Sequence, residues 1–359
     1  MGWRHYVFLI ALSGAVTLAL TPLVRAWSMR RGLVDVGGGR KVHMGAISRL
    51  GGVAMFVGFA VAMTTEYVGE RWYGWGGTMV KADGPFLGVV FGLVIIFVTG
   101  VLDDVFTLRP AVKLAGQLAA AGVAIWLGLR VDFFGNPFGG GLFALGVIGI
   151  PVTLLWIVGF TNVINLIDGL DGLAAGVTAI AVTSFLVLVH QQNQLVAAAL
   201  ACALIGCCLG FLRYNFNPAS IFMGDSGSMF LGFALAAISL LGVMKSVAAI
   251  TLVVPLLVIG VPIFDTASAI IRRIRHNRPI QDADRGHIHH RLLDRGFNQR
   301  QTVLIIYMWS IALAVGGYAM RFAPGFIKFS AFFILALLSG LMASWLGLFD
   351  VIHAHTDEE

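Results

Sequence analysis

The chain has 359 residues and a formal net charge of +6, and 58% of its residues are hydrophobic while only 12% are charged. A soluble domain carries about 25% charged residues, and the longest polar stretch here, at about 272–300, is too short to bury a core of its own. The composition therefore excludes a soluble enzyme and predicts one integral membrane domain over residues 1–359. Most of the 24 Lys and Arg residues fall on alternate loops between apolar segments, which is typical of cytoplasmic loops rather than of a nucleic-acid surface.

Eleven apolar segments approach the length of about 20 residues that a helix needs to cross a bilayer. They lie at about 6–24, 51–67, 85–102, 113–130, 144–162, 173–190, 195–212, 228–244, 247–271, 303–321 and 326–349. The main positive cluster follows the first segment, so we expect a retained helix with its N-terminus outside and the basic loops in the cytoplasm. The predicted fold is an all-α polytopic membrane protein of about eleven helices, or ten, because the division between the eighth and ninth segments is the least clear.

The third apolar segment ends in two adjacent carboxylates, Asp103 and Asp104. Such a pair can bind Mg²⁺, or one carboxylate can act as a base while its neighbour stays ionised. Neighbours on a helix diverge by about 100°, so we expect different roles for the two; a solvated start of a loop is the alternative. Lys113 and Gln117 follow on the next segment and indicate a polar pocket, although a lysine at the membrane interface would give the same pattern.

A second polar pattern ends the fifth segment, and its members are spaced by three: Asn162, Asn165, Asp168 and Asp171. On a helix this spacing forms one polar stripe. Gly169 and Gly172 favour a break of the helix there and a close approach of the backbone to a ligand. Amide and carboxylate oxygens are ligands that Mg²⁺ prefers, and polar groups at membrane depth are costly. We therefore interpret the pattern as functional, with a Ca²⁺-like turn or a merely capped turn as the alternative.

The next polar loop contains Asp225 between Gly224 and Gly227. The glycines predict a tight turn whose N–H groups could meet phosphate, and the single carboxylate could bind a metal. Phe222 could stack on a base or pack in the membrane. Upstream, the seventh segment contains Cys202, Cys207 and Cys208, which we expect to be buried thiols because no metal-site spacing is present.

The longest polar stretch contains a cluster of histidines, His287, His289 and His290, between Arg285 and Arg291. A zinc site would need cysteines or a regular histidine pair, and the two arginines would repel a cation. Arginine and histidine together favour an anion site of the kind that binds pyrophosphate. A basic surface loop is the alternative.

These segments, in this order, resemble the polyprenyl-phosphate N-acetylhexosamine-1-phosphate transferases of glycosyltransferase family 4. The resemblance spans about residues 40–295, and the run Asn165–Gly172 together with Met223-Gly224-Asp225 is specific in combination. The histidine run 284–293 and Arg49-Leu50-Gly51-Gly52 are similar to the undecaprenyl-phosphate GlcNAc-1-phosphate transferase branch. The translocase branch usually has a Pro-Phe-His-His-His type of run and Thr-Met-Gly-Gly at these places.

The resemblance implies Mg²⁺-dependent transfer of GlcNAc-1-phosphate from UDP-GlcNAc to undecaprenyl phosphate, with release of UMP, as the first step of a cell-envelope polysaccharide. Mn²⁺ is an alternative metal. The implied location is the cytoplasmic face of a bacterial inner membrane, among membrane lipids, and because relatives are often dimers a homodimer is a further implied partner. Two alternatives stay open at this point, a phospho-MurNAc-pentapeptide translocase and a cation- or proton-coupled transporter.

The resemblance also implies roles for single residues. Metal contacts are implied for Asn165 and Asp225. Catalytic roles are implied for Asp103, which would deprotonate the lipid phosphate, for Asp104 beside it, and for Asp168. Substrate binding is implied for Lys113, Asp171, Asn215, Phe222, His287, His289, His290 and Arg291. Thr107 stands where some relatives have a further Asp or Asn, so a third ligand from that loop is not expected.

Overall fold

The computed structural model describes residues 2–36, 46–74, 83–135, 142–243, 260–275, 288–319 and 325–345. The helices of these ranges are α1 (Trp3–Arg30), α2 (Gly51–Tyr73), α3 (Gly84–Phe106), α4 (Pro110–Trp126), α5 (Gly149–Ile167), α6 (Leu173–Gln191), α7 (Leu195–Asn215), α8 (Gly224–Val243), α10 (Gly260–Arg275), α11 (Ile288–Asp294), α12 (Gln299–Ala319) and α13 (Gly325–Trp345). Two short antiparallel hairpins pair β1 (Val34–Val36) with β2 (Ala46–Ser48), and β3 (Phe133–Gly135) with β4 (Leu142–Ala144).

Eight of the described helices are long and apolar enough to cross a membrane, namely α1, α2, α3, α5 with the turn before it, α6, α7, α8 and α12. Helix α4 and the middle of α13 are shorter apolar helices. The prediction of a helical, multi-pass membrane protein is therefore confirmed. The count of eleven spans and the outward N-terminus stay predictions, and the segment predicted at 247–271 lies partly outside the described residues.

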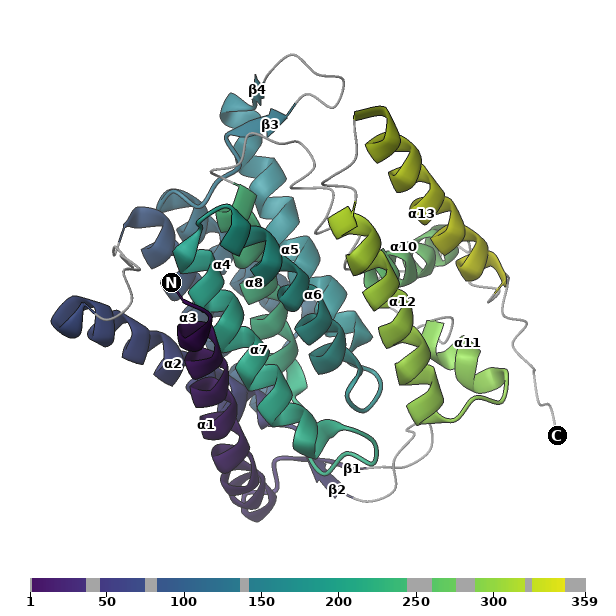
Figure 1. The fold of residues 1–359 in the computed structure, drawn as a ribbon. Coiled ribbons are helices and arrows are strands. Elements are labelled where there is room, and N and C mark those ends of the chain that lie inside the picture. Colours follow the sequence, from purple (N-terminus) through teal and green to yellow (C-terminus); the bar gives the residue numbers. More distant parts are fainter. Residues whose placement is uncertain are drawn as a thin grey trace.

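Helix α8 occupies the centre of the bundle, and α2, α3, α5, α6 and α7 pack around it (Figure 1). Its side chains are apolar and buried almost all round, as in Phe230 and Phe233, which is typical of a helix enclosed by others rather than one that faces lipid. Helix α1 packs on α7 and α2, and α12 packs on α6. The three cysteines of α7 are buried free thiols, as predicted.

Glycines let two neighbouring helices approach the first turn of α8 closely. A Cβ at Gly100 of α3 would lie 2.5 Å from the Cα of Ser226, and a Cβ at Gly52 of α2 would overlap the backbone of Gly227. Small residues at such positions bring helix backbones together in a membrane. The start of α8, which carries Asp225, is thereby fixed between α2 and α3.

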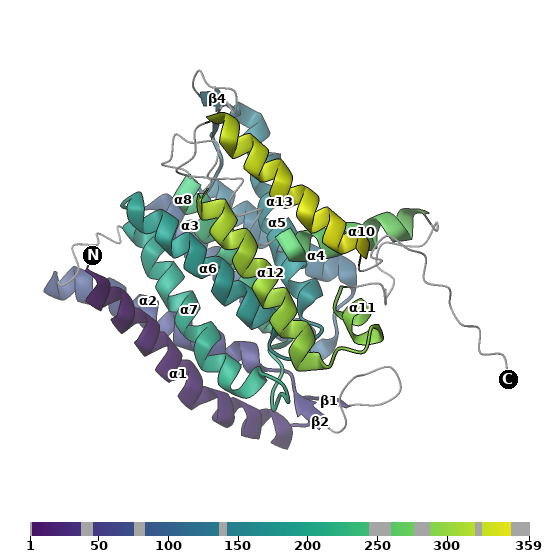
Figure 2. The same ribbon diagram turned by 45° about the vertical axis from the view of Figure 1, so that its right-hand side comes forward.

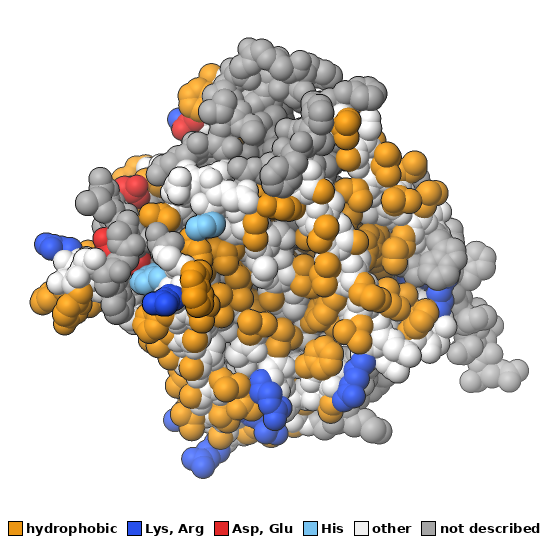
Figure 3. Space-filling view, viewed as in Figure 1, with side chains coloured by type: hydrophobic (Ala, Val, Ile, Leu, Met, Phe, Trp, Pro, Cys, Tyr) orange, Lys and Arg blue, Asp and Glu red, His pale blue; other side chains and the backbone are white. Residues whose placement is uncertain are grey.

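The ends of several helices gather at one end of the bundle. Helices α3, α5 and α7 end there, α8 and α12 begin there, and β1 and β2 lie beside them, while β3 and β4 lie at the opposite end (Figures 1 and 2). Exposed Arg25, Arg30, Arg31 and Arg213 lie near this same end. Figure 3 shows apolar side chains over the middle of one face and Lys and Arg along its lower edge. The bundle thus presents a basic, polar end below a mainly apolar wall.

Candidate active site

A cavity of about 660 Å³ opens at the polar end of the bundle. Nine of the residues predicted from the sequence line it: Asp103, Asp104, Asn165, Asp168, Asp171, Asn215, Phe222, Asp225 and His290. They come from five separate segments, spread over nearly 190 residues of sequence. The volume falls within the range of about 300–1,000 Å³ that is typical of small-molecule sites.

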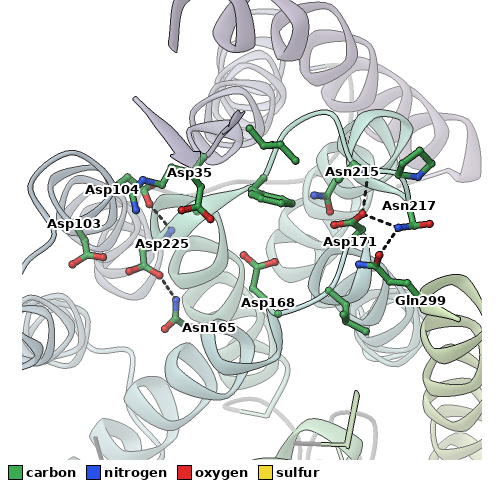
Figure 4. A pocket seen from close by; sticks show the side chains of 18 of the residues that line it. Asp35, Asp103, Asp104, Asn165, Asp168, Asp171, Asn215, Asn217, Asp225 and Gln299 are labelled. Carbon is green, nitrogen blue, oxygen red and sulfur yellow. Dashed lines mark hydrogen bonds between the residues drawn. The ribbon is translucent and has the colours of Figure 1, made fainter. Parts of the chain in front are cut away.

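One end of the cavity is built around Asp225, in the first turn of α8 (Figure 4). Its Oδ1 accepts a hydrogen bond of 2.5 Å from the Asn165 side-chain amide, at the end of α5. Its Oδ2 accepts a hydrogen bond from the ammonium of Lys113, which also lies 3.3 Å from Oδ2 of Asp103. Lys113 itself does not line the cavity. The structure therefore joins predicted catalytic, substrate-binding and metal residues in one charged cluster.

Asp104 has a different environment from its neighbour Asp103. Only 4% of Asp104 is exposed, and its two oxygens accept backbone hydrogen bonds of 2.8 Å from Asp225 and 3.0 Å from Ser226. These N–H groups belong to the first turn of α8, where a helix leaves its amide donors without internal partners. Asp104 thus caps α8 from a neighbouring helix. This geometry favours a positioning role for Asp104 over the catalytic role that the resemblance implies.

The polar stripe predicted from the spacing by three is only half helical. Asn162 and Asn165 lie on α5, but the helix ends at Ile167, and Asp168 and Asp171 lie in the turn that follows. Gly172 in this turn has a φ of +81°, a conformation that side chains disfavour. The break of the helix predicted here is therefore confirmed, and the stripe is helical only in its first two members.

Asp168 lies between the two ends of the cavity in Figure 4. Burial is the main cause that raises the pKa of its carboxyl well above the usual range, and the negative charges of Asp225, Asp104 and Asp171 raise the pKa further. Among the described residues, no side chain or backbone group forms a hydrogen bond with the Asp168 carboxyl group, although the Asp168 backbone N–H donates to the Asn165 carbonyl. Asp168 is therefore a carboxyl group aimed at the cavity and available to a ligand.

The other end of the cavity is a network of amides around Asp171. Its Oδ2 accepts hydrogen bonds from the Asn217 side chain at 2.9 Å and from the Ala219 backbone at 3.0 Å. Asn217 also donates to Gln299, the first residue of α12, at 2.5 Å. Asn215 is 2% exposed and joins the two loops, because it accepts from the Gly172 backbone and donates to the Ile221 backbone.

The loop before α8 is held against β2 and the start of α2 by backbone hydrogen bonds. Phe222 donates its N–H to Ser48 at 2.8 Å and accepts from Gly51 at 2.9 Å, and Met223 accepts from Gly52 at 2.9 Å. The half-buried Phe222 side chain lines the cavity. Its backbone is thus fixed on both sides, which positions the ring that was predicted to stack on a base.

The histidine motif reaches the cavity through α11. His290 lines the cavity, whereas Arg291 does not. The backbone N–H of Ile288, at the start of α11, donates 2.7 Å to Oδ1 of Asp265, a buried carboxylate of α10. His287 lies outside the described residues, as does the side chain of His289.

Four cavity residues with polar or charged side chains were not predicted as site residues: Asp35, Arg49, Asn217 and Gln299. Arg49 and Asn217 stand within motifs that the sequence did single out. Asp35 is an isolated acid between two valines, and Gln299 opens an apolar helix, so neither carries a local pattern that distinguishes it. Only the folded arrangement brings these two side chains to the site.

The oxygen donors at the Asp225 end suit a hard divalent cation. Asp103 and Asp225 supply carboxylates, and the amide oxygen of Asn165 accepts no hydrogen bond from the described residues. No cluster of three His, Cys, Asp or Glu side chains forms a complete metal site within the described ranges. Mg²⁺ in phosphate-transfer sites typically uses one or two carboxylates and completes its coordination with water and substrate phosphates, so these residues fit Mg²⁺ bound together with a phosphorylated substrate.

Comparisons with known proteins identify the family of the chain. The family described as Glycosyl transferase family 4 matches residues 86–243, which include both carboxylate ends of the cavity. A probable undecaprenyl-phosphate N-acetylglucosaminyl 1-phosphate transferase of Bacillus subtilis (strain 168) is 39% identical over 341 residues, covering 95% of this chain and 91% of that protein. A decaprenyl-phosphate N-acetylglucosaminephosphotransferase of Mycolicibacterium smegmatis is 36% identical, covering 88% and 83%.

A member of the translocase branch is similar over a comparable length but at lower identity. The phospho-N-acetylmuramoyl-pentapeptide-transferase of Desulfitobacterium hafniense is 30% identical over 340 residues, covering 88% of this chain and 97% of that protein. Identities of 30–39% over nearly the whole chain, together with the motif residues assembled around one cavity, establish that the chain is related to these transferases. The chain belongs to the polyprenyl-phosphate N-acetylhexosamine-1-phosphate transferases of glycosyl transferase family 4.

Proposed function

We propose that this protein transfers GlcNAc-1-phosphate from UDP-GlcNAc to undecaprenyl phosphate and releases UMP. The observation that carries the proposal is the division of the cavity into two ends, with Asp103, Asp225 and Asn165 at one and the Asp171 network at the other (Figure 4). The first end supplies charge and oxygen donors for phosphates. The second supplies the fixed polar groups that a nucleotide requires. The activities named for the more similar relatives support GlcNAc as the transferred sugar and a polyprenyl phosphate as the acceptor.

In this proposal the nucleotide binds at the Asp171 end, where Phe222 stacks on the uracil and Asn215 holds the two loops together. The diphosphate then extends past Asp168 toward Asp225. Asp103 takes the proton of the lipid phosphate, whose oxygen attacks the sugar-bearing β-phosphorus. The bond from that phosphorus to the bridging oxygen breaks, and UMP leaves with the bridging oxygen.

A divalent metal, Mg²⁺ or Mn²⁺, would be held by Asp225 and Asn165 and would screen the charge of the phosphates that meet in the cavity. His290 lines the cavity and would contact the sugar or the pyrophosphate. Arg291, together with His287 and His289, belongs to the same motif and is proposed for the same side of the donor. A one-step transfer fits these roles better than a covalent enzyme intermediate, because Asp103 is then free to act as the base.

We further propose that the site faces the cytoplasm of a bacterial inner membrane, with eleven spans and the N-terminus outside. The exposed arginines near the site end of the bundle support this orientation, since cytoplasmic loops carry an excess of Lys and Arg. We also propose the homodimer that the resemblance implies, and the mass of the protein in detergent would test it. A transporter is disfavoured because the carboxylates gather at one end of the bundle, whereas transporter sites usually lie near the midplane.

The donor is tested by UMP release from the purified protein with undecaprenyl phosphate, Mg²⁺ and either UDP-GlcNAc or UDP-MurNAc-pentapeptide. We expect UMP from UDP-GlcNAc and a background rate from the pentapeptide donor. UMP from the pentapeptide donor alone would move the protein to the translocase branch. UMP from neither donor would contradict the proposed transfer.

Replacement of Asp225 by alanine is expected to weaken activation by Mg²⁺. Loss of a residue that only orients a metal ligand typically costs about 10–100-fold in metal affinity or activity, so loss of a direct ligand should raise the half-activating Mg²⁺ concentration by at least about tenfold. The measurement is UMP release over a Mg²⁺ titration. Asp132→Ala is the matched control, because it removes a carboxylate paired with Arg130 near the opposite end of the bundle. An unchanged titration in Asp225→Ala would remove Asp225 from the metal site.

A further inference from the structure

Lys113 holds an unusual place for a residue expected to bind substrate phosphate. It lies in the first turn of α4, its ammonium pairs with both Asp103 and Asp225, and it is not part of the cavity lining. All three side chains are partly buried. Within the described ranges, Lys113 is the one cation that forms an ion pair with either carboxylate. In this structure its charge is therefore directed at the carboxylates rather than into the cavity.

The surrounding helices hold Lys113 in this position. One turn further along α4, Gln117 forms a pair of hydrogen bonds with Asn162 of α5, at 2.7 Å and 3.2 Å. Asn162 lies one turn before Asn165, which binds Asp225. Polar side chains that bond across helices fix their relative position in a membrane. The Gln117–Asn162 pair thus fixes the position of Lys113 along the bundle axis relative to Asp225 of α8.

The charges of this cluster have a consequence for metal binding. Asp103 and Asp225 together would carry a charge of −2, and the ammonium of Lys113 reduces it to −1. A divalent cation that approaches the same oxygens is attracted less and is repelled by the ammonium, and both effects are stronger in a partly buried site than in water. The diphosphate of a sugar nucleotide would supply the negative charge that the cluster lacks.

We propose that Lys113 is an internal counter-ion that weakens metal binding to the empty site, so that the metal binds tightly only together with the diphosphate of the donor. This inference rests on the proposed metal site and deepens it. Coupling of this kind is reciprocal, so the metal tightens the nucleotide by the same factor as the nucleotide tightens the metal. The site would then take up its metal chiefly when a donor is present.

The test is the affinity for Mn²⁺, measured by electron paramagnetic resonance on the full-length protein in detergent, with and without UDP. Wild type is expected to bind Mn²⁺ weakly alone and more tightly with UDP. Lys113→Met is expected to bind Mn²⁺ about tenfold more tightly than wild type without UDP, because one positive charge is removed from beside the oxygens that would bind the divalent cation. The tightening by UDP should shrink correspondingly in this variant.

Two control variants separate a local from a general effect of charge. Lys113→Arg keeps the positive charge and should bind Mn²⁺ much as wild type does. Arg109→Met removes the exposed arginine just before α4 and should also leave Mn²⁺ affinity unchanged. A direct phosphate ligand would behave differently, since its loss would weaken UDP and leave Mn²⁺ affinity without UDP unchanged.

Unchanged or weaker Mn²⁺ binding in Lys113→Met without UDP would overturn the inference, as would equal tightening in Arg109→Met. The readout is independent of turnover, so it can fail while wild type still releases UMP from UDP-GlcNAc. Conversely, a wild-type protein that releases no UMP would contradict the proposed function. The role of Lys113 would still be tested by the measured Mn²⁺ affinities.

Discussion

Asp103→Asn is expected to lower kcat by about 10²–10⁴-fold, the range for loss of a general base, with a smaller change in KM. The asparagine oxygen can still accept the hydrogen bond of 2.9 Å that the Leu108 backbone donates to Asp103. The end of α3 should therefore keep its structure while the group that takes the proton is lost. The measurement is steady-state UMP release over a range of undecaprenyl phosphate concentrations.

The thermal unfolding midpoint of the same variant serves as its control, and it should stay near that of wild type. A kcat like that of wild type would exclude Asp103 as the base. A large loss of thermal stability together with the loss of activity would instead indicate that Asp103 supports the structure.

Asp104→Ala is expected to lower both stability and activity, unlike the change at its neighbour. The substitution removes the acceptor of two backbone N–H groups at the start of α8, in a buried place. Each buried donor left without a partner costs about 1–3 kcal/mol. Asp225 lies in the turn that would shift, and misplacement by 1 Å can cost about 10²-fold in rate. The measurements are the thermal midpoint in detergent and the rate of UMP release.

Leu102→Ala is the matched control for Asp104→Ala, because Leu102 precedes the pair on α3 with an exposed side chain. This control should change both quantities little. A variant Asp104→Ala that unfolds at the wild-type temperature but has lost activity would contradict the capping role and favour direct participation in the chemistry.

The apolar segments could be predicted well because a membrane helix is recognised in a sequence by the length of its hydrophobic run. The predicted ends of these helices were less accurate where the contacts that determine a helix end come from residues distant in sequence. Helix α8 was predicted to begin at residue 228 but begins at Gly224, since its first turn is capped by Asp104, which lies 121 residues from Asp225 along the chain. Helix α5 extends to Ile167, five residues beyond its predicted end.

The site could be anticipated where its residues form local motifs and not where they act singly. Asp168, Asp171 and Asp225 stand in polar runs at the ends of apolar segments, and all three line the cavity. Gln299 reaches Asn217 across 82 residues of sequence, and no local spacing reports such a contact. The pairing of Lys113 with Asp225 likewise depends on the packing of α4 beside α3 and α5.

The central claim is that the sugar and its β-phosphate move together onto the lipid. The most direct test supplies UDP-GlcNAc labelled with tritium in the sugar and with phosphorus-32 in the β-phosphate, and follows both labels into organic solvent. We predict that both labels enter the lipid fraction in equal amounts, in parallel with UMP in the aqueous phase. Tritium in the lipid with phosphorus-32 left behind as UDP would mean transfer of the sugar alone, and would contradict the account.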